Sequence, residues 1–581
     1  MLKLLETDES SGPESDEDDE DEYGGDSDSS EENVNYKSKK RKSDSSSIRR
    51  IVLDPCSDAI SIENEFRKKT YYRNKILPEA LNVSEWIKID SDEYLPKREK
   101  SLDMLAVDVS EIKNMQESIS LPRFKGEVLN DASVMFCGGP VTSLSWCTNQ
   151  SLQSSQILAI AVKIHSMPSK ISDNIGSPGL IQLWSYKSGK SPEFKLGICH
   201  NHGAVWSLEW CPSIDEKSGC LGMLAAGCSD GSIRIWSPPS LSKLESGKLY
   251  VKEADISLVT NGEDIGQCLS ISWYRGPGHE YIAGCFTSGT VSIWHVTTKS
   301  PLLRLNPRTL LPVQTWLGHA GSIVSVSLCP GTDPVPRYLV TGGTDRCYKF
   351  WDLRDTNVPI QEVKRGLVTD VSWISGWAGS GVCYDDVYLQ SHTQTLLAEI
   401  GFLNSKSHHH PVISQNSATS KMSVSQWLNV MAVCTAAGEL IIFVIPSLHK
   451  SLEHDKNLSQ RRCYVYWSEV CSTKNDTVDN ERSYENTSKF TKLVFHDFGL
   501  HKSNFSKNLQ SQEEMRRIRV SENMSIEDLS MYPVASLTSV AWNNNPGQNT
   551  LVASGGQSGI VRCHDLSCLK TQNVLKELKK C

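Results

Sequence analysis

A recurring strand pattern constrains this sequence more than any other feature. In most copies a glycine-containing turn is followed by a short strand that ends on an aromatic residue five positions later. Such internal self-similarity is typical of repeat folds, in which one unit cannot bury its apolar faces alone. The copies are GLIQLW (179–184), GSIRIW (231–236), GTVSIW (289–294), RCYKFW (346–351), GELIIF (438–443) and GIVRCH (559–564).

Two further strands precede most copies of this pattern. One is rich in small residues, such as MLAAGCSD (223–230), and an earlier one often ends on Trp, as in VWSLEW (205–210). Short β-branched and aromatic runs between Gly, Ser, Asp and Pro are typical of all-β proteins. Radial packing of four-stranded antiparallel units buries both faces of each unit.

We therefore predict an all-β chain that folds as a seven-bladed WD40 β-propeller. The fifth and sixth units lack part of the pattern, so six or eight blades stay open as alternatives. The run HHHPVISQNSATS (408–420) has no strand period and is interpreted as a loop. The predicted blades begin near residues 141, 205, 268, 323, 368, 411 and 537.

The rest of the chain is divided by composition. Few apolar residues and many charges at the N-terminus predict disorder, and the Lys-, Glu-, Asn- and Ser-rich stretch before the last blade is longer than ordinary propeller loops. The predicted parts are a disordered acidic and basic tail (1–50), an N-terminal extension (51–135), blades one to six (136–446), a long insertion (447–534), the last blade (535–570) and a C-terminal tail (571–581).

Charge is unevenly distributed along the 581 residues. Residues 1–36 carry a net charge of −14, residues 37–50 carry +6, and the remaining chain carries −1. A nearly neutral body argues against DNA binding driven mainly by phosphate neutralisation. Within the basic stretch, the cluster Lys39, Lys40, Arg41 and Lys42 predicts recognition by a nuclear import receptor, the alternative being a solvated charge run.

Several residues of the repeats are predicted to be structural. His319 follows a glycine ahead of the fourth unit, and we expect it to form a buried hydrogen-bonded pair with Asp345. The tryptophans Trp206, Trp316, Trp377 and Trp427 fall outside the pattern, so each is either a surface anchor or packed beneath a blade loop. The predicted structural WD-repeat residues are Asp230, Trp236, Trp294, His319, Asp345 and Trp351.

No set of residues predicts catalysis, a cofactor or a metal. Cys199, His200 and His202 lie close together, as do the histidines at 408–410, but neither group has the second ligand pair that zinc sites need. The 18 cysteines follow no framework spacing, which favours reduced thiols in the cytosol or nucleus. No secretory signal and no run of eighteen apolar residues is visible, so no membrane association is expected.

Several segments resemble the WD-repeat subunit two of general transcription factor IIIC. They are VWSLEWCPS (205–213), LGMLAAGCSDGSIRIWSPP (221–239), YLVTGGTDRCYKFWDLRDTNVPI (338–360), SLTSVAWNNN (536–545) and LVASGGQSGIVRCHDL (551–566). The resemblance implies a nuclear, non-enzymatic scaffold that supports recognition of the B box and transcription of tRNA genes by RNA polymerase III. It implies as partners a large DNA-binding subunit and a second propeller-type subunit, with auxiliary DNA contact and no small-molecule substrate.

A short motif supports a competing interpretation. The sequence Trp351-Asp352-Leu353-Arg354 resembles the WDxR motif through which propeller substrate receptors dock on the adaptor of cullin-4 ubiquitin ligases. In that alternative Asp352 and Arg354 contact the adaptor. A single WDLR is common among propellers by chance, so the transcription-factor resemblance is preferred.

Overall fold

The computed structural model describes sixteen stretches of the chain. All of them belong to the compact unit Arg50–Cys581. The predicted nuclear import cluster at Lys39–Lys42 lies outside the described residues. The described stretches are residues 82–97, 101–108, 119–130, 132–148, 155–164, 177–212, 219–262, 265–374, 379–385, 393–399, 409–415, 417–445, 462–472, 491–498, 534–545 and 547–567.

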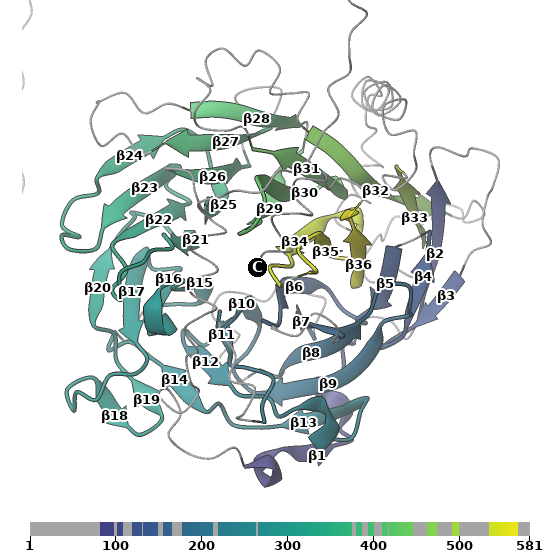
Figure 1. Ribbon diagram of the computed structural model, residues 1–581, viewed down its shortest axis with the longest axis horizontal. Helices are drawn as coiled ribbons and strands as arrows, with labels where there is room; N and C mark the ends of the chain where they lie inside the picture. The colour runs from purple at the N-terminus through teal and green to yellow at the C-terminus, as the bar shows by residue number, and fades with distance from the viewer. Residues whose placement is uncertain are drawn as a thin grey trace, which may run out of the picture. The chain divides into compact units, whose positions relative to one another are not determined.

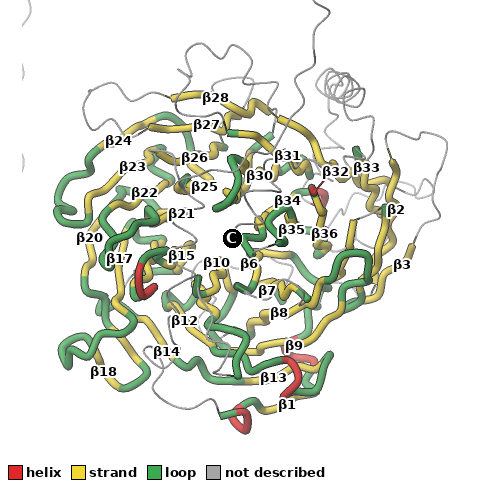
Figure 2. Tube along the Cα trace, viewed as in Figure 1, coloured by secondary structure: helices red, strands yellow, loops and turns green. Residues whose placement is uncertain are grey.

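The described residues form seven β-sheets arranged around a common centre (Figure 1). The innermost strand of each sheet contacts the innermost strand of the next sheet, and the last contacts the first, so the ring closes. The strands dominate these stretches, with only short helical turns between them (Figure 2). The prediction of an all-β propeller is therefore confirmed.

The first three sheets, named here by the order of their innermost strands, use contiguous chain with added edge strands. Sheet one contains β1 (Ile87–Ile89), β13 (Lys248–Val251), β9 (Glu193–His200), β8 (Gly179–Tyr186), β7 (Gln156–Val162) and β6 (Val141–Trp146). Sheet two contains β10 (Val205–Trp210), β11 (Leu224–Cys228), β12 (Ile233–Trp236), β14 (Ile256–Leu258), β19 (Thr309–Leu310) and β18 (Arg304–Asn306). Sheet three contains β15 (Cys268–Trp273), β16 (Tyr281–Phe286), β17 (Thr290–His295) and β20 (Gln314–Leu317).

Sheets four and five are simple four-stranded units, whereas sheets six and seven recruit distant segments. Sheet four contains β21 (Ile323–Leu328), β22 (Tyr338–Gly343), β23 (Cys347–Asp352) and β24 (Gln361–Lys364). Sheet five contains β25 (Val368–Trp373), β26 (Gly379–Tyr384), β27 (Thr393–Glu399) and β28 (His409–Gln415). Sheet six contains β29 (Thr419–Val424), β30 (Val430–Thr435), β31 (Glu439–Val444), β32 (Arg462–Ser472), β33 (Thr491–Asp497), β2 (Ser101–Asp108) and β3 (Ile119–Pro122). Sheet seven contains β34 (Leu537–Trp542), β35 (Leu551–Gly556), β36 (Ile560–Asp565), β5 (Ala132–Phe136) and β4 (Gly126–Leu129).

Short 3-10 turns complete the described elements: η1 (Val83–Glu85), η2 (Asp92–Tyr94), η4 (Leu241–Lys243) and η5 (Pro277–His279). The turn η1 leads into β1, and between them Trp86 is only 5% exposed. Its side chain joins the apolar cluster that contains Tyr250 and Trp236. The N-terminal part of the chain thus docks Trp86 against sheets one and two.

One part of the strand prediction is wrong. The stretch 408–420 was interpreted as a loop, but His409–Gln415 is strand β28 and the next sheet begins at Thr419 instead of near 411. The strand pairs antiparallel with β27, and Val412 and Ile413 within it are 3% and 0% exposed. Burial of these two apolar side chains stabilises the strand. The polar residues around them gave the sequence no recognisable strand pattern.

Five strands from residues 87–136, β1 to β5, lie in the sheets. The strand β5 pairs antiparallel with β36, so a segment near the N-terminal side completes the sheet formed by the last repeat. The strand β2 pairs parallel with β33, a pairing between Met104 and Leu493. This joining of early and late segments closes the ring through hydrogen bonds.

The repeat turn explains the glycine in the sequence pattern. Gly231, Gly289, Gly438 and Gly559 have φ values of 79°, 83°, 79° and 80°, the left-handed region that glycine adopts without a Cβ penalty. In the fourth unit Arg346 occupies this turn with φ of 70°. The fourth unit therefore keeps the same turn geometry without a glycine, and the backbone of Arg346 is strained there.

Aromatic side chains at the end of each repeat strand fill the space between neighbouring sheets. Trp184, Trp236 and Trp294 are 0% exposed and Trp351 is 2% exposed. Small residues occupy the adjacent strands: a Cβ at Gly284 would lie 3.2 Å from the ring of Trp294. Large rings packed against small residues give the wedge-shaped filling that radial packing of sheets requires.

Candidate functional site

A polar chain crosses the interior of sheet four. His319 Nδ1 lies 2.9 Å from Asp345 Oδ1, His319 Nε2 lies 2.8 Å from Thr341 Oγ1, and Trp351 Nε1 donates to Thr341 Oγ1 at 2.9 Å. A single proton assignment satisfies all three contacts, with Trp351 donating to Thr341, Thr341 to His319 and His319 to Asp345. The structure therefore brings together three of the predicted structural residues and adds Thr341.

The surroundings of His319 in this hydrogen-bonded network favour a neutral imidazole. Burial lowers the pKa of His319 despite the opposing hydrogen bond to Asp345. Burial also acts to raise the pKa of Asp345, but the hydrogen bond from His319 and the amides of Cys347 and Ala320 outweigh it and lower that pKa. Asp345 is thus an acceptor held by three donors, and its role is to order the turn and the histidine rather than to move protons.

Sheet two holds a related arrangement whose histidine the sequence analysis did not identify. His202 Nδ1 lies 3.1 Å from Asp230 Oδ2, and Arg234 and Ser232 also donate to Asp230. Burial opposes ionisation of Asp230, yet the hydrogen bonds from His202 and Ser232 lower its pKa to about 2. The signal was present, because His202 precedes Asp230 by 28 residues much as His319 precedes Asp345 by 26.

Two of the tryptophans at the ends of the repeat strands donate to backbone carbonyls. Trp236 Nε1 donates to the carbonyl of Lys252 at 2.9 Å, and Trp294 Nε1 donates to that of Val259 at 3.2 Å. The structure places both between sheets as packing residues.

Of the tryptophans outside the pattern, Trp427 is 1% exposed and is not a surface anchor. Trp206 and Trp316 are half-buried: Trp206 donates to Gln267 Oε1 at 2.8 Å, and the ring of Trp316 packs against Trp351. Trp377 lies outside the described residues. Of the two alternatives, burial beneath a loop therefore describes Trp427.

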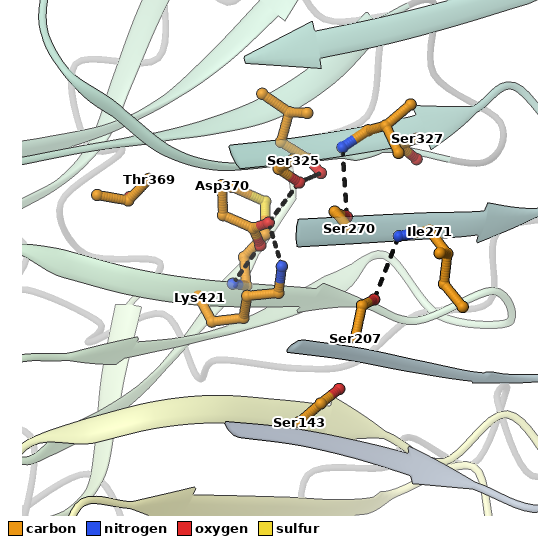
Figure 3. A network of polar contacts seen from close by, with 12 residues as sticks. Ser143, Ser207, Ser270, Ile271, Ser325, Ser327, Thr369, Asp370 and Lys421 are labelled. Carbon is orange, nitrogen blue, oxygen red and sulfur yellow. Dashed lines mark hydrogen bonds and ion pairs between the residues drawn. The ribbon is translucent and has the colours of Figure 1, made fainter. Parts of the chain in front are cut away.

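The wall of the central channel is a ring of short polar side chains (Figure 3). At the third position of the innermost strands, serine accepts a hydrogen bond from an amide of the next sheet. Ser143 accepts from Leu208 at 2.9 Å, and Ser207 accepts from Ile271 at 3.3 Å. At the fifth position, Ser327 accepts from Trp373 at 3.0 Å. These bonds join neighbouring sheets where their strands come closest.

Two innermost strands replace the serine with a charged residue. Asp370, which is 2% exposed, accepts from Ser325 Oγ at 2.7 Å and from the amide of Met422 at 2.9 Å. Lys421 Nζ lies 2.7 Å from the same carboxylate (Figure 3). Burial acts to lower the pKa of Lys421, but Asp370 reverses this and raises it. The ion pair thus continues the ring of contacts between sheets five and six.

The channel encloses a cavity of about 240 Å³ with few ionisable groups on its wall. One of them is Glu209, which accepts from the amide of Trp273 at 2.6 Å. Burial raises the pKa of Glu209 to about 7. A single carboxylate and an internally paired Asp370–Lys421 do not form the acid and base pair that hydrolytic chemistry needs.

The Cys199–His202 stretch has a structural arrangement. His200 is stacked on His202 and on Trp236, with ring centroids 5.6 Å and 5.3 Å away, and Nδ1 of His200 accepts from the amide of His202. Burial lowers the pKa of His200 to about 3. Within the described stretches no group of three or more His, Cys, Asp or Glu residues is placed to hold a metal. His408 and the side chains of His409 and His410 lie outside the described residues.

The WDLR motif lies at the end of β23. Arg354 has a side chain that is 68% exposed, and its guanidinium contacts Asp352 Oδ2 at 2.5 Å. Arg337 approaches the same carboxylate at 3.5 Å. Asp352 is therefore engaged by two arginines of its own chain, and Arg354 presents its outer edge to solvent.

The described cysteines are thiols, and most lie buried on the strands. Burial raises the pKa of Cys199, Cys285 and Cys329 to about 12. No described helix is long and apolar enough to span a bilayer.

This chain is similar in sequence to a repeat family and to several known proteins. The family model described as WD domain, G-beta repeat matches residues 194–237 and 310–352. The human protein General transcription factor 3C polypeptide 2 is 27% identical over 576 residues, covering 88% of this chain and 62% of the human protein. Transcription factor tau subunit sfc6 of Schizosaccharomyces pombe is 23% identical over 458 residues, covering 77% of this chain and 67% of that protein. Protein transport protein SEC13 of Coccidioides immitis is 27% identical over 180 residues, covering 30% of this chain and 55% of that protein.

These similarities differ in extent. The chain spans about 62% of the length of the human relative, and the SEC13 match is confined to less than a third of this chain. The two transcription factor subunits match across most of it. The resemblance inferred from the repeat segments is thus confirmed: the chain contains WD repeats and is similar over most of its length to General transcription factor 3C polypeptide 2.

Proposed function

We propose that this protein is a non-enzymatic scaffold subunit of transcription factor IIIC, supporting B-box recognition and RNA polymerase III transcription of tRNA genes through protein–protein contacts. The observation that carries the proposal is the extent of the similarity, 88% of the chain for the human relative against 30% for SEC13. A likeness due to WD repeats alone would be confined to the repeat segments. This one also covers the connecting segments that differ between propeller proteins.

The chemistry of the described residues supports a binding role. Serines and an internally paired Asp370–Lys421 line the channel, and the carboxylates of Asp230 and Asp345 are held by structural donors. Rigid sheets that carry exposed loops are well suited to holding other proteins. The proposed partners are the large DNA-binding subunit and the second propeller-type subunit of the factor.

DNA contact is proposed to be auxiliary. Residues 51–581 carry a net charge of −1, which provides little general attraction for phosphates. The DNA affinity of the assembled factor is therefore assigned to its large subunit. DNA affinity of the remaining assembled subunits should be measured at increasing salt concentration. The dependence of the affinity on salt should be the same with and without this chain.

Affinity purification of the tagged full chain from nuclear extract tests the proposal. Mass spectrometry is expected to recover the large DNA-binding subunit and the second propeller-type subunit. The alternative, a cullin-4 substrate receptor, predicts recovery of the ligase adaptor and its loss on Arg354→Ala. Recovery of the adaptor with no subunit of the transcription factor would overturn the proposal.

Nuclear localisation is proposed to depend on the basic cluster in the N-terminal tail. Replacing Lys39, Lys40, Arg41 and Lys42 with alanine removes the charges that an import receptor recognises. Fluorescence microscopy of the tagged variant is expected to show cytoplasmic protein. A matched variant with Lys97, Lys125 and Lys187 changed to alanine should stay nuclear. Nuclear retention of the first variant would assign import to a partner.

A further inference from the structure

Exposed apolar side chains concentrate at one end of sheets two to four. Ten large hydrophobic residues are exposed in the described part of the chain, and six of them lie in three loops. The first is the connection of residues 296–313 between β17 and β20, which includes the edge hairpin β18–β19 of sheet two and carries Leu305 on β18; the others are residues 329–337, between β21 and β22, and residues 353–360, between β23 and β24. The six residues and their exposed fractions are Leu302 (84%), Leu305 (62%), Val313 (43%), Val335 (55%), Val358 (70%) and Ile360 (37%).

Strand direction means that all three connections begin at the same end of the sheets. In a four-stranded antiparallel unit, the first and third strands both run toward the end where the first strand finishes. The loops leave β17, β21 and β23, which are third, first and third strands. We call this the WD-end surface, because the Trp351-Asp352 pair that ends β23 lies there.

Hydrogen bonds between the loops make the WD-end surface continuous. Gln314 Nε2, at the start of β20, donates to Thr356 Oγ1 at 3.0 Å, which ties sheet three to the third loop. The amide of Leu353 donates to the carbonyl of Arg337 at 2.8 Å, which ties the third loop to the second. The apolar residues therefore belong to one surface that crosses neighbouring sheets.

The loops of the WD-end surface are also internally fixed. Arg304 Nε donates to the carbonyl of Thr298 at 2.7 Å, and the amide of Leu311 donates to the carbonyl of Leu303 at 2.9 Å. In the third loop the amide of Asn357 donates to Asp355 Oδ1 at 3.1 Å. Apolar side chains held outward on fixed loops favour association, because little conformational entropy is lost when a partner binds.

The charge of the WD-end surface indicates the chemistry of its partner. Its three loops contain five Lys or Arg residues and two Asp residues, a net charge of +3, against −1 for residues 51–581 as a whole. Arg337 and Arg354 have side chains that are 47% and 68% exposed, and both contact the single carboxylate of Asp352. The arginines therefore leave a positive edge beside the apolar residues, which suits a partner that carries carboxylates.

We infer that the WD-end surface docks a segment of another subunit of the same transcription factor, in which apolar side chains alternate with Asp or Glu. The inference rests on the proposed function. The apolar loops supply the buried area, and the arginines at their edge select the acidic segment and fix its register. The opposite end of the same sheets exposes only Leu317 and Leu367 among the large hydrophobics of the described residues.

The first experiment is co-purification of the full chain with coexpressed subunits of the factor. The double variant L302D/V358D places carboxylates where the partner's apolar side chains dock, so binding would bury unpaired charges, and we expect it to reduce recovery of one subunit by about tenfold or more. The matched control is Leu317→Asp, because Leu317 is 70% exposed on the edge strand β20 but lies at its other end. Thermal unfolding of the isolated chains should be equal for both variants.

The second experiment identifies what covers the surface. A photo-crosslinking amino acid replaces Val358 in the assembled complex, and the crosslinked peptide is sequenced by mass spectrometry. A peptide of another subunit with apolar and acidic residues supports the inference. Crosslinks to residues 1–36 of this chain, to a second copy, or to no protein in the complex overturn it. So does full recovery of every subunit by L302D/V358D, whereas failure of the unmodified chain to recover any subunit overturns the proposed function instead.

Discussion

Sheets four and six reach stability by different means. Sheet four uses contiguous chain from Ile323 to Lys364, and its polar chain of His319, Thr341, Trp351 and Asp345 lies within a single repeat. Sheet six combines two distant segments in seven strands, β29 to β33 and β2 with β3, and the paired Met104 of β2 and Leu493 of β33 are 389 positions apart. A regular repeat is thus held by local polar contacts, and an irregular one by contacts between distant segments.

A buried ion pair is the main polar contact between sheet six and sheet seven. Arg562 on β36 forms two hydrogen bonds with Asp497 at the end of β33, at 2.8 Å and 2.9 Å. The guanidinium lies between the rings of Tyr466 and Phe495, 4.5 Å and 4.4 Å from their centroids. Burial opposes ionisation of Asp497, but Arg562 keeps its pKa below the ordinary value.

The largest effect is expected from Asp497→Ala. The substitution leaves the guanidinium of Arg562, which is 1% exposed, without its carboxylate, and this should lower the free energy of unfolding by about 3–5 kcal/mol. Denaturant unfolding of the purified chain measures the change. The double variant Asp497→Leu with Arg562→Met removes both charges and should lose less. If the single and double variants are equally destabilised, packing rather than the ion pair joins these sheets.

A smaller effect is expected from Asp370→Ala in the channel wall. The change removes the acceptor of Ser325, Met422 and Lys421, at a cost of about 2–3 kcal/mol. The loss stays below that of Asp497 because the side chain of Lys421 is 35% exposed to the channel. The paired variant Asp370→Ser with Lys421→Ser reproduces the residues of the regular sheets and should recover part of the loss. Equal unfolding free energies for wild type and Asp370→Ala would show that the ring contacts add no stability here.

In the regular sheet, Thr341→Val should cost about 1–2 kcal/mol. The valine keeps the shape of threonine but leaves His319 Nε2 and Trp351 Nε1 without a shared hydroxyl. Thr341→Ser keeps the hydroxyl and is the matched control. The unfolding midpoint in urea measures both variants. A valine variant as stable as the serine variant would mean that packing of Trp351 alone holds the repeat together.

The sequence predicted the regular half of this comparison better than the irregular half. The innermost strand of sheet four begins where the pattern predicts, at Ile323, and the spacing of His319 and Asp345 was sufficient to pair them. These features are local and recur with each repeat. The strands β28 and β29 were missed because their few apolar residues lie among His and Gln in β28 and among Thr, Ser and Lys in β29.

The contacts of sheet six were beyond sequence reasoning for a physical reason. Asp497 and Arg562 each lie in an ordinary strand pattern, and only folding brings them to 2.8 Å. Pairing of Met104 with Leu493 leaves no periodic signal, because a parallel contact between distant segments depends on the topology and not on neighbouring residues. His202 differs from these contacts, because its spacing from Asp230 matches that of His319 from Asp345 and an alignment of the repeats would have identified it.

The smallest effect is expected at Glu209, which replaces the serine found at the fifth position of most innermost strands. Burial raises the pKa of Glu209 to about 7 from an ordinary value of 4.5, so the folded protein holds this proton more tightly than the unfolded chain. The free energy of unfolding should therefore fall as pH rises from about 4.5 to about 7. Because the side chain is only partly buried, the fall attributable to it is about 1 kcal/mol. Glu209→Gln does not titrate, so this variant should lose less stability between the two pH values. Denaturant unfolding at about pH 4.5 and about pH 7 measures the change. The control Ser272→Ala, at the same position of sheet three, should keep the pH dependence of the unmodified protein. An unchanged pH dependence in Glu209→Gln would assign the proton to another group.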